Sequence, residues 1–181
     1  MEIFKRIYFV VLVITLAFVG RLIPHAPNFV PMLALALFSG FYFKNKKYAI
    51  LVPLSAMLIS DVIIGFYDIK VMLSVYLSFG LVALSGRLLK NRLSFASIIV
   101  SSAGGAVLFF LVTNFAVWIF SGIYAHNLAG LMESYYLALP FFRNTLTSGL
   151  FYSALFFGAY DLAFSKKIIL NLKQIYAKAS I

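Results

Sequence analysis

The sequence predicts an all-α integral membrane protein, a bundle of six transmembrane helices with both termini in the cytoplasm. The first observation is composition: 64% of the 181 residues are hydrophobic and 11% are charged, whereas a soluble domain has about 25% charged residues. The second is that the basic residues, which give a net charge of +10, fall in short gaps between apolar runs. That placement is typical of membrane orientation. Residues 1–181 contain no repeat and no linker, so one transmembrane domain is expected.

Six apolar runs approach the length of about 20 residues that a membrane-spanning helix needs. The first follows Lys5 and Arg6, and the short second one opens in the proline-rich stretch RLIPHAPNFVP. The expected spans cover residues 7–23, 28–43, 48–67, 71–86, 93–121 and 139–164. Between the last two, the stretch HNLAGLMESYY fits a short interfacial helix. The tail, residues 166–181, has apolar and basic faces and is expected to lie on anionic lipid of the inner leaflet.

The basic residues also predict the orientation. If the N-terminus is cytoplasmic and the spans alternate, twelve of the 15 Lys and Arg residues lie on the inner side. Only Arg21, Lys70 and Arg143 then fall in the outer half. Because positive charge is retained on the cytoplasmic side, we expect a protein of the bacterial cytoplasmic membrane with both termini inside.

Polar side chains converge on the outer half of the predicted bundle. Charged groups at such depth are costly and mark functional sites by default. They predict a ligand-binding cavity open to the outer face, formed by Arg21, His25, Asn28, Asp61, Asn114, Trp118, Glu133, Arg143 and Asn144. Two arginines and the start of the second helix favour a small anionic or carboxylate-bearing ligand. Prolines 24, 27 and 31 are expected to fix the rim of this cavity.

Several of these residues have a second interpretation. Asp61 can pair with Arg21 or Arg143, and Asn28 can cap the second helix. Trp118 and the tyrosines at 124, 135 and 136 also fit an interfacial aromatic belt. Ser60 and Asp61 are adjacent and are expected to point in different directions around their helix.

Other residues predict the surroundings of the cavity. The loop from Ile123 to Tyr136 is expected to cover the cavity, to contact residues 24–28, and to carry Glu133 either in solvent or as a gate. The fourth span contributes only Ser and Tyr and is expected at the periphery. Small residues at 34–40 and 101–105 allow close helix packing, either within the bundle or against another membrane subunit.

Enzymatic chemistry finds little support in the sequence. There is no cysteine, and there is no G-x-S-x-G, H-E-x-x-H or P-loop motif. The histidines at 25 and 126 lie in outer connections and are expected to be solvated, not metal-bound. We therefore expect no enzyme activity, no cofactor, no metal and no nucleic-acid partner.

The motifs resemble those of a widespread bacterial family of unknown function, made of small six-helix membrane proteins. The matching runs are RLIPHAPNFVPMLALALFSG, VPLSAMLISDVIIGFYD, TNFAVWIFSGIY and GLMESYYLALPFFRNTLTSGLFY. That family in turn distantly resembles the substrate-binding S components of energy-coupling factor transporters. The resemblance implies an outward-facing ligand cavity, with Arg21, Pro24, Asn28, Pro31, Asp61, Asn114, Pro140, Phe141, Phe142 and Asn144 at motif positions.

One departure bears on partners. S components carry an alanine-spaced A-x-x-x-A face on the first helix for docking onto a transmembrane coupling subunit with ATPases. The first span here, IYFVVLVITLAFVG, lacks it. The small faces on the second and fifth spans then become candidate docking surfaces, and a solitary carrier stays open.

The sequence thus predicts a membrane binding or uptake protein for a small molecule, with lipid as its surroundings. The rival prediction is a structural or assembly protein without a ligand, whose polar cluster only packs helices. An intramembrane enzyme is the weaker third alternative. An outer cavity, as opposed to solid packing of the polar residues, would discriminate between the first two.

Overall fold

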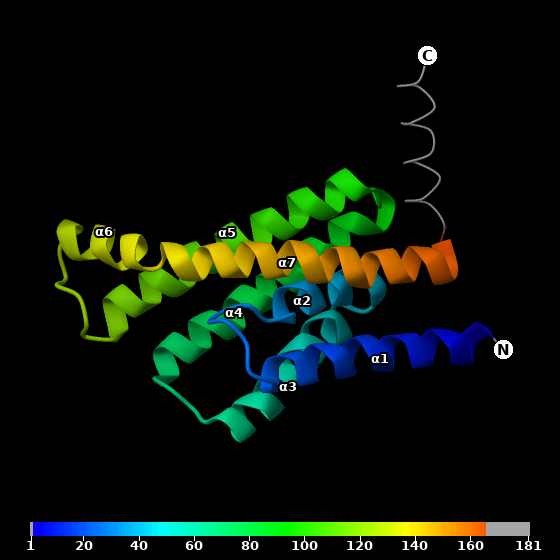
Figure 1. Cartoon of the computed structure of the whole chain (residues 1–181), viewed down its shortest axis with the longest axis horizontal. Coiled ribbons are helices and arrows are strands. Elements are labelled where there is room, and N and C mark those ends of the chain that lie inside the picture. Colours follow the sequence, from blue (N-terminus) through cyan, green and yellow to red (C-terminus); the bar gives the residue numbers. More distant parts are fainter. Residues whose placement is uncertain (1, 166–181) are drawn as a thin grey trace, which may run out of the picture.

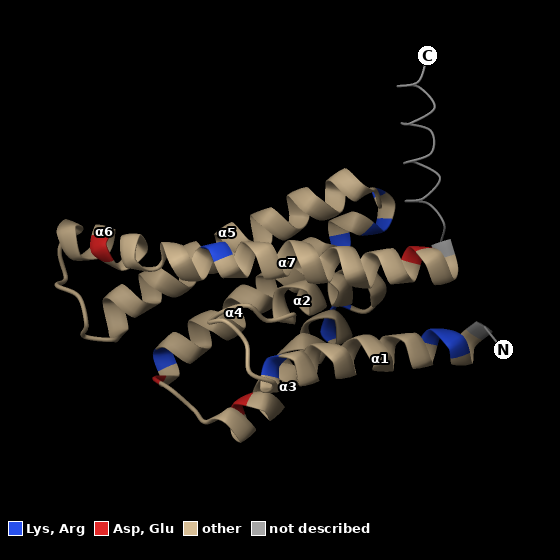
Figure 2. Ribbon diagram, viewed as in Figure 1, with Lys and Arg blue, Asp and Glu red and all other residues tan. Residues whose placement is uncertain are grey.

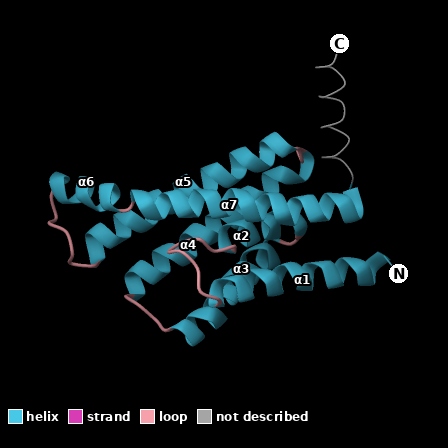
Figure 3. Cartoon of the chain, in the orientation of Figure 1, coloured by secondary structure: helices cyan, strands magenta, loops and turns pink. Residues whose placement is uncertain are grey.

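The structure is a computed structural model that describes residues 2–165, and every regular element in that range is a helix (Figures 1 and 3). The elements are α1 (Glu2–Leu22), α2 (Met32–Tyr42), α3 (Lys46–Ile64), α4 (Ile69–Gly86), η1 (Arg87–Asn91), α5 (Phe95–Phe120), α6 (Leu128–Leu137), α7 (Leu139–Tyr160) and the short π-helix η2 (Asp161–Ser165). The six predicted spans correspond to α1, α2, α3, α4, α5 and α7. The tail expected on the inner leaflet lies outside the described residues.

Four helical segments are long and apolar enough to cross a membrane: Ile3–Leu22, Lys46–Ile64, Ile69–Asn91 and Phe95–Phe120. Helix α7 has 22 residues, but Arg143, Asn144 and three hydroxyl residues near its start make it more polar. Helix α2 has only 11 residues, about 16 Å at 1.5 Å per residue. These lengths and compositions make the chain a plausible membrane protein.

Side-chain caps begin four of the helices. Asn45 accepts the amide of Lys47 at the start of α3, and Asp68 accepts two amides at the start of α4. Ser94 and Ser97 form a reciprocal capping box on α5. Such caps satisfy amides that have no partner within the helix.

Helix α2 is the centre of the bundle. Nine of its 11 residues are buried, and it packs against α1, α3, α4, α5 and α7. The prediction that this helix begins at Asn28, with Asn28 as its cap, is wrong. The residue that precedes the helix is Pro31, which makes no side-chain cap bond, and Asn28 adopts a left-handed backbone with φ of 61°.

Glycines allow α2 and α4 to cross closely. A Cβ added to Gly40 would lie 1.8 Å from the carbonyl oxygen of Ala83, and one added to Gly86 would lie 2.1 Å from that of Leu37. The small residues of α2 are therefore buried within the bundle. They cannot serve as a docking surface for another subunit. The fourth span at the periphery is also a wrong prediction, because α4 packs against α2, α3 and α5.

The two ends of the bundle differ in charge. We call the end that carries the start of α1 the proximal end, and the end at which α1 reaches Leu22 the distal end (Figure 1). Most of the lysines and arginines gather at the proximal end (Figure 2). There Lys90 Nζ and Arg87 Nη1 donate to the carbonyl oxygens of Phe43 and Lys44, at 2.6 and 3.2 Å, and so cap the C-terminus of α2.

The short helix expected near residues 126–136 is confirmed as α6. It begins at Asn127, whose side chain accepts the amide of Gly130, and leads through Ala138 directly into α7. It packs against α5, where the Tyr135 hydroxyl donates to the carbonyl oxygen of Leu111 at 2.8 Å. Residues 126–138 thus form a wall of the distal end.

Candidate ligand-binding cavity

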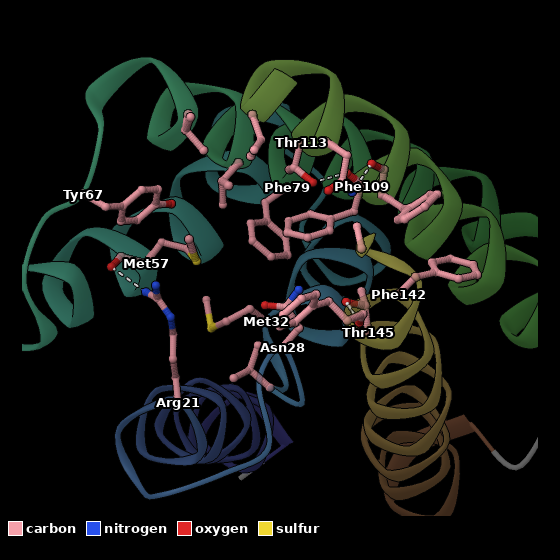
Figure 4. Close-up of a pocket in the computed structure, with 18 of the residues that line it drawn as sticks. Arg21, Asn28, Met32, Met57, Tyr67, Phe79, Phe109, Thr113, Phe142 and Thr145 are labelled. Carbon is pink, nitrogen blue, oxygen red and sulfur yellow. Dashed lines mark hydrogen bonds between the residues drawn. The ribbon is translucent and has the colours of Figure 1, made fainter. Parts of the chain in front are cut away.

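A cavity of about 820 Å³ occupies the distal half of the bundle. It lies between the end of α1, the α1–α2 connection, the facing ends of α3 and α4, α5, and the junction of α6 with α7 (Figure 4). Its volume is in the range of small-molecule sites, about 300–1,000 Å³. Such a cavity is the observation that, on the sequence alone, would favour ligand binding over solid helix packing.

Arg21 and Asp61 form an ion pair at one side of this cavity. Arg21 Nη2 lies 2.5 Å from Asp61 Oδ1, and Asp61 is only 1% exposed. Arg21 Nη1 donates to the carbonyl oxygen of Met57 at 3.0 Å and also to Ser60 Oγ. The ion-pair interpretation of Asp61 is confirmed. Ser60 and Asp61, which were expected to point in different directions around the helix, both contact Arg21, because its planar guanidinium fork reaches both.

Two tyrosines complete this cluster. The Tyr76 hydroxyl of α4 donates to Asp61 Oδ2 at 2.7 Å, so α1, α3 and α4 meet at one carboxylate. Tyr67, in the connection after α3, lines the cavity. Burial, and then the negative charge of Asp61, raise the pKa of Tyr67 to about 12. Its hydroxyl therefore keeps its proton at neutral pH and can donate a hydrogen bond.

The α1–α2 connection forms the rim, and α7 fixes it in place. Asn144 Nδ2 donates to the carbonyl oxygen of Pro27 at 2.9 Å, and Ser148 Oγ donates to that of Asn28 at 3.4 Å. The imidazole of His25 lies 2.9 Å from the carbonyl oxygen of Ala26 and 3.2 Å from that of Arg21. His25 and Asn28 line the cavity, whereas Asn144 acts behind it as a positioning residue.

The opposite side of the cavity carries neutral polar groups. Thr113 and Asn114 of α5 and Thr145 of α7 line it. Each bonds to the carbonyl oxygen four residues earlier, at 2.8, 2.8 and 3.0 Å respectively. The Ser134 hydroxyl of α6 donates to the carbonyl oxygen of Leu131, three residues earlier, at 2.8 Å. The hydroxyl protons are thus engaged, and the oxygens remain as acceptors.

Three predicted site residues lie elsewhere. Glu133 and Arg143 are exposed and do not line the cavity. The indole of Trp118 donates to the carbonyl oxygen of Ala125 at 2.9 Å and closes the α5–α6 turn. Without Arg143, the anionic ligand expected from the sequence loses one of its two arginines. The other, Arg21, is already compensated by Asp61.

The predicted lid is realised only in part. Tyr124 and Ser134 line the cavity, but the α5–α6 loop lies at the distal tip of the bundle, away from the α1–α2 connection (Figure 1). The contacts that hold residues 24–28 come from Asn144 and Ser148 of α7. A helix, α6, occupies most of the segment that was expected to be a mobile loop.

Sequence reasoning missed the apolar wall of the cavity. Met32, Met57, Phe79 and Phe109 form most of it (Figure 4). Phe142, which the family resemblance had named only as a motif position, completes it. Sequence reasoning also missed Tyr67 and the carboxylate partner Tyr76. The rings of Phe79 and Phe109 lie 5.1 Å apart, and those of Phe110 and Phe142 lie 4.8 Å apart. Such rings suit an apolar or aromatic ligand.

No group of three His, Cys, Asp or Glu residues within residues 2–165 could hold a metal ion. His126 packs edge-on against Trp118, with ring centroids 5.9 Å apart, and does not join His25 in the cavity lining. The cavity therefore offers hydrogen bonds and apolar contact to a ligand.

Comparison with protein families gives a match over nearly the whole chain. The profile of a family described as "Family of unknown function (DUF6580)" matches residues 1–174. No curated protein and no solved structure matches the chain.

Proposed function

The chain belongs to this family of unknown function, and from the geometry of its cavity we propose a membrane protein that binds a small molecule for uptake. The observation that carries the proposal is the 820 Å³ space, assembled from distant segments of the chain and lined by polar groups on an apolar wall. A protein whose polar residues served only packing would leave no such space. The cavity therefore disfavours a structural or assembly protein without a ligand.

The proposal includes six membrane crossings with both termini in the cytoplasm. The start of α1 and the end of α7 lie at the same end of the bundle (Figure 1), which fits an even number of crossings. The short α2 completes its crossing with the irregular connection 23–31, which α7 holds by hydrogen bonds. Non-helical backbone is tolerated at membrane depth where protein buries it. The distal cavity then opens toward the outside of a bacterial cytoplasmic membrane.

The proposal also keeps the likeness to S components of energy-coupling factor transporters, which rests on the motif resemblance. A transmembrane coupling subunit with ATPases is then one partner, and a solitary carrier is the other possibility. The face of α2 is buried, so of the two small faces only that of α5 remains for docking; there Gly104 has no atom within 4 Å of an added Cβ. No catalytic step is proposed.

The experiment is native mass spectrometry of protein purified in lipid nanodiscs, with Val75→Trp as the test variant. Val75 lines the cavity from α4, so an indole there should fill the space and displace a bound molecule. Val100→Trp is the matched control, because Val100 is 70% exposed on α5 and outside the cavity. We expect a retained small molecule in the wild type and in the control, and its loss in Val75→Trp. Wild type that neither retains a molecule nor binds any added compound in this space would contradict the proposal.

A further inference from the structure

The charges around the cavity limit what it can hold. Arg21 is the only charged side chain among the lining residues of the described chain, and its partner Asp61 is 1% exposed behind it. The pair is neutral as a unit. A carboxylate ligand that moved from water into the cavity would find no unpaired positive charge there, and burial of such a charge at low dielectric is costly. An ammonium ligand would face the guanidinium of Arg21 directly.

The hydrogen-bonding groups at the two sides of the cavity are of opposite kinds. Figure 4 shows Arg21 and Tyr67 on one side and Phe142 and Thr145 on the other. Arg21 has five N–H donors, of which the structure engages three. With the Tyr67 hydroxyl, they make this side a donor side. Because the Tyr67 hydroxyl stays protonated at neutral pH, it adds no second negative charge there.

On the other side, the hydroxyl oxygens of Thr113 and Thr145 offer hydrogen-bond acceptors, next to the Asn114 amide, whose Nδ2 already donates to the carbonyl oxygen of Phe110. Both hydroxyl protons bond to carbonyl oxygens of their own helices, at 2.8 and 3.0 Å. The two residues line the cavity and are 8% and 6% exposed, so they have little contact with bulk water. An oxygen whose proton is engaged accepts a hydrogen bond but would repel a carboxylate. Ser134 on α6 has the same arrangement.

Apolar side chains separate the donor side from the acceptor side. Met32 and Met57 approach from α2 and α3, and Phe79 and Phe109 approach from α4 and α5 (Figure 4). Thioethers and ring faces contact flat or aromatic groups favourably. A ligand that extends between the two sides must therefore be apolar in its middle.

We propose that this cavity holds an uncharged small molecule with an apolar, flat middle, a hydrogen-bond acceptor at its Arg21–Tyr67 end, and N–H or O–H donors at its Thr113–Thr145 end. The inference rests on the proposed function, since it names the ligand class of the same site. It replaces the carboxylate-bearing ligand that two arginines had suggested.

The test is a panel of fused aromatic fragments that carry a methyl ketone at one end as the hydrogen-bond acceptor. At the other end each fragment is present as primary carboxamide, methyl ester, carboxylate and aminomethyl compound. Naphthalene is one such ring system, and its four compounds are 6-acetyl-2-naphthamide, methyl 6-acetyl-2-naphthoate, 6-acetyl-2-naphthoate and (6-acetylnaphthalen-2-yl)methylammonium. Binding is measured by titration calorimetry on the full chain in nanodiscs. We expect the carboxamides to bind at least about ten-fold more tightly than the two charged forms, as one uncompensated charge or buried unpaired donor implies.

Four variants identify the ends of the site. Thr113→Val and Thr145→Val remove an acceptor at nearly constant shape, and should weaken the carboxamides about ten-fold while leaving the esters unchanged. Thr147→Val is the matched control, because Thr147 makes the same i−4 bond on α7 but is exposed and outside the cavity. Tyr67→Phe should weaken carboxamides and esters alike.

The outcomes separate the two proposals. Carboxylates that bind most tightly, or carboxamides that are indifferent to Thr113→Val and Thr145→Val, would overturn the ligand class and leave the binding function standing. If Val75→Trp abolished the binding of no fragment of any class, the binding function itself would be overturned. Tight carboxamide binding that depends on the two threonines supports both.

Discussion

At the scale of single residues, the partners of the Arg21 guanidinium determine its role in the structure. Its guanidinium joins the carbonyl oxygen of Met57, Ser60 Oγ and Asp61 Oδ1, and Tyr76 holds the second carboxylate oxygen. One carboxylate therefore ties three helices together at the wall of the cavity. Removal of either charge would leave the other buried and unpaired.

This arrangement predicts a strong coupling between the two charges. Arg21→Met or Asp61→Asn alone should lower the free energy of unfolding by about 3–5 kcal/mol, the cost of an uncompensated buried charge. The double variant should recover much of that loss. Arg143→Met is the control and should change stability little, because Arg143 is exposed. Additive losses in the double variant, measured by thermal or denaturant unfolding in detergent, would contradict the coupling.

Asn28 makes a second prediction at this scale. Its φ of 61° is left-handed, a conformation that costs an ordinary L-residue about 1–2 kcal/mol. Asn28→Gly should preserve stability, and Asn28→Ala should lower the free energy of unfolding by about 1 kcal/mol. Ligand affinity measured on the same two variants distinguishes an effect of the Asn28 backbone conformation from an effect of its side chain. Equal loss of affinity in both variants would show that the Asn28 amide side chain itself contacts the ligand, because glycine adopts the left-handed backbone without strain.

At the scale of helices, the apolar runs of the sequence predicted the number and approximate extent of α1, α3, α4, α5 and α7. They could not predict the start of α2, since the left-handed Asn28 and the turn at Pro31 depend on the bonds that Asn144 and Ser148 donate from a distant helix. They could not find the apolar wall of the cavity either. In a membrane protein, Met57 and Phe109 have the same chemistry as a residue that faces lipid, so only the fold separates them.

The crossing of α2 and α4 gives a prediction for a pair of glycines. Gly40→Ala would place a Cβ 1.8 Å from the Ala83 carbonyl oxygen. The backbone must then separate, so we expect loss of the folded protein or a large drop in its melting temperature. Gly104→Ala is the matched control in α5, where nothing lies within 4 Å of the added Cβ. That change should be neutral, or stabilising by up to about 1 kcal/mol. Equal effects of the two substitutions on the melting temperature would contradict a close crossing of α2 and α4.

At the scale of the whole molecule, charge is segregated along the bundle. Basic residues gather at the proximal end (Figure 2), and the cavity occupies the distal half. The proximal location of the charge predicts which end faces the cytoplasm. In the proposed orientation, the cavity faces the opposite compartment, where a molecule taken up by the cell would first be met.

Reporter fusions test this orientation directly. A fusion at each terminus should report the cytoplasm, and a fusion inserted between Gly65 and Asp68, in the α3–α4 connection, should report the opposite side. A reporter signal that differs between the two termini would require an odd number of crossings and would contradict the six-span topology.

The distance along the chain between Arg21 and its ion-pair partner Asp61 also affects how the protein is inserted during synthesis. Forty residues separate Arg21 from Asp61, and at roughly 5–20 residues per second the ribosome needs about 2–8 s to synthesise them. If α1 crosses the membrane as proposed, the translocon must accept it during that interval with an unpartnered cation. It can do so because Arg21 occupies the last turn of α1, where a long side chain reaches the headgroups. An arginine at the centre of α1 would add about 2.5–3.5 kcal/mol to insertion, before any partner helix had left the ribosome.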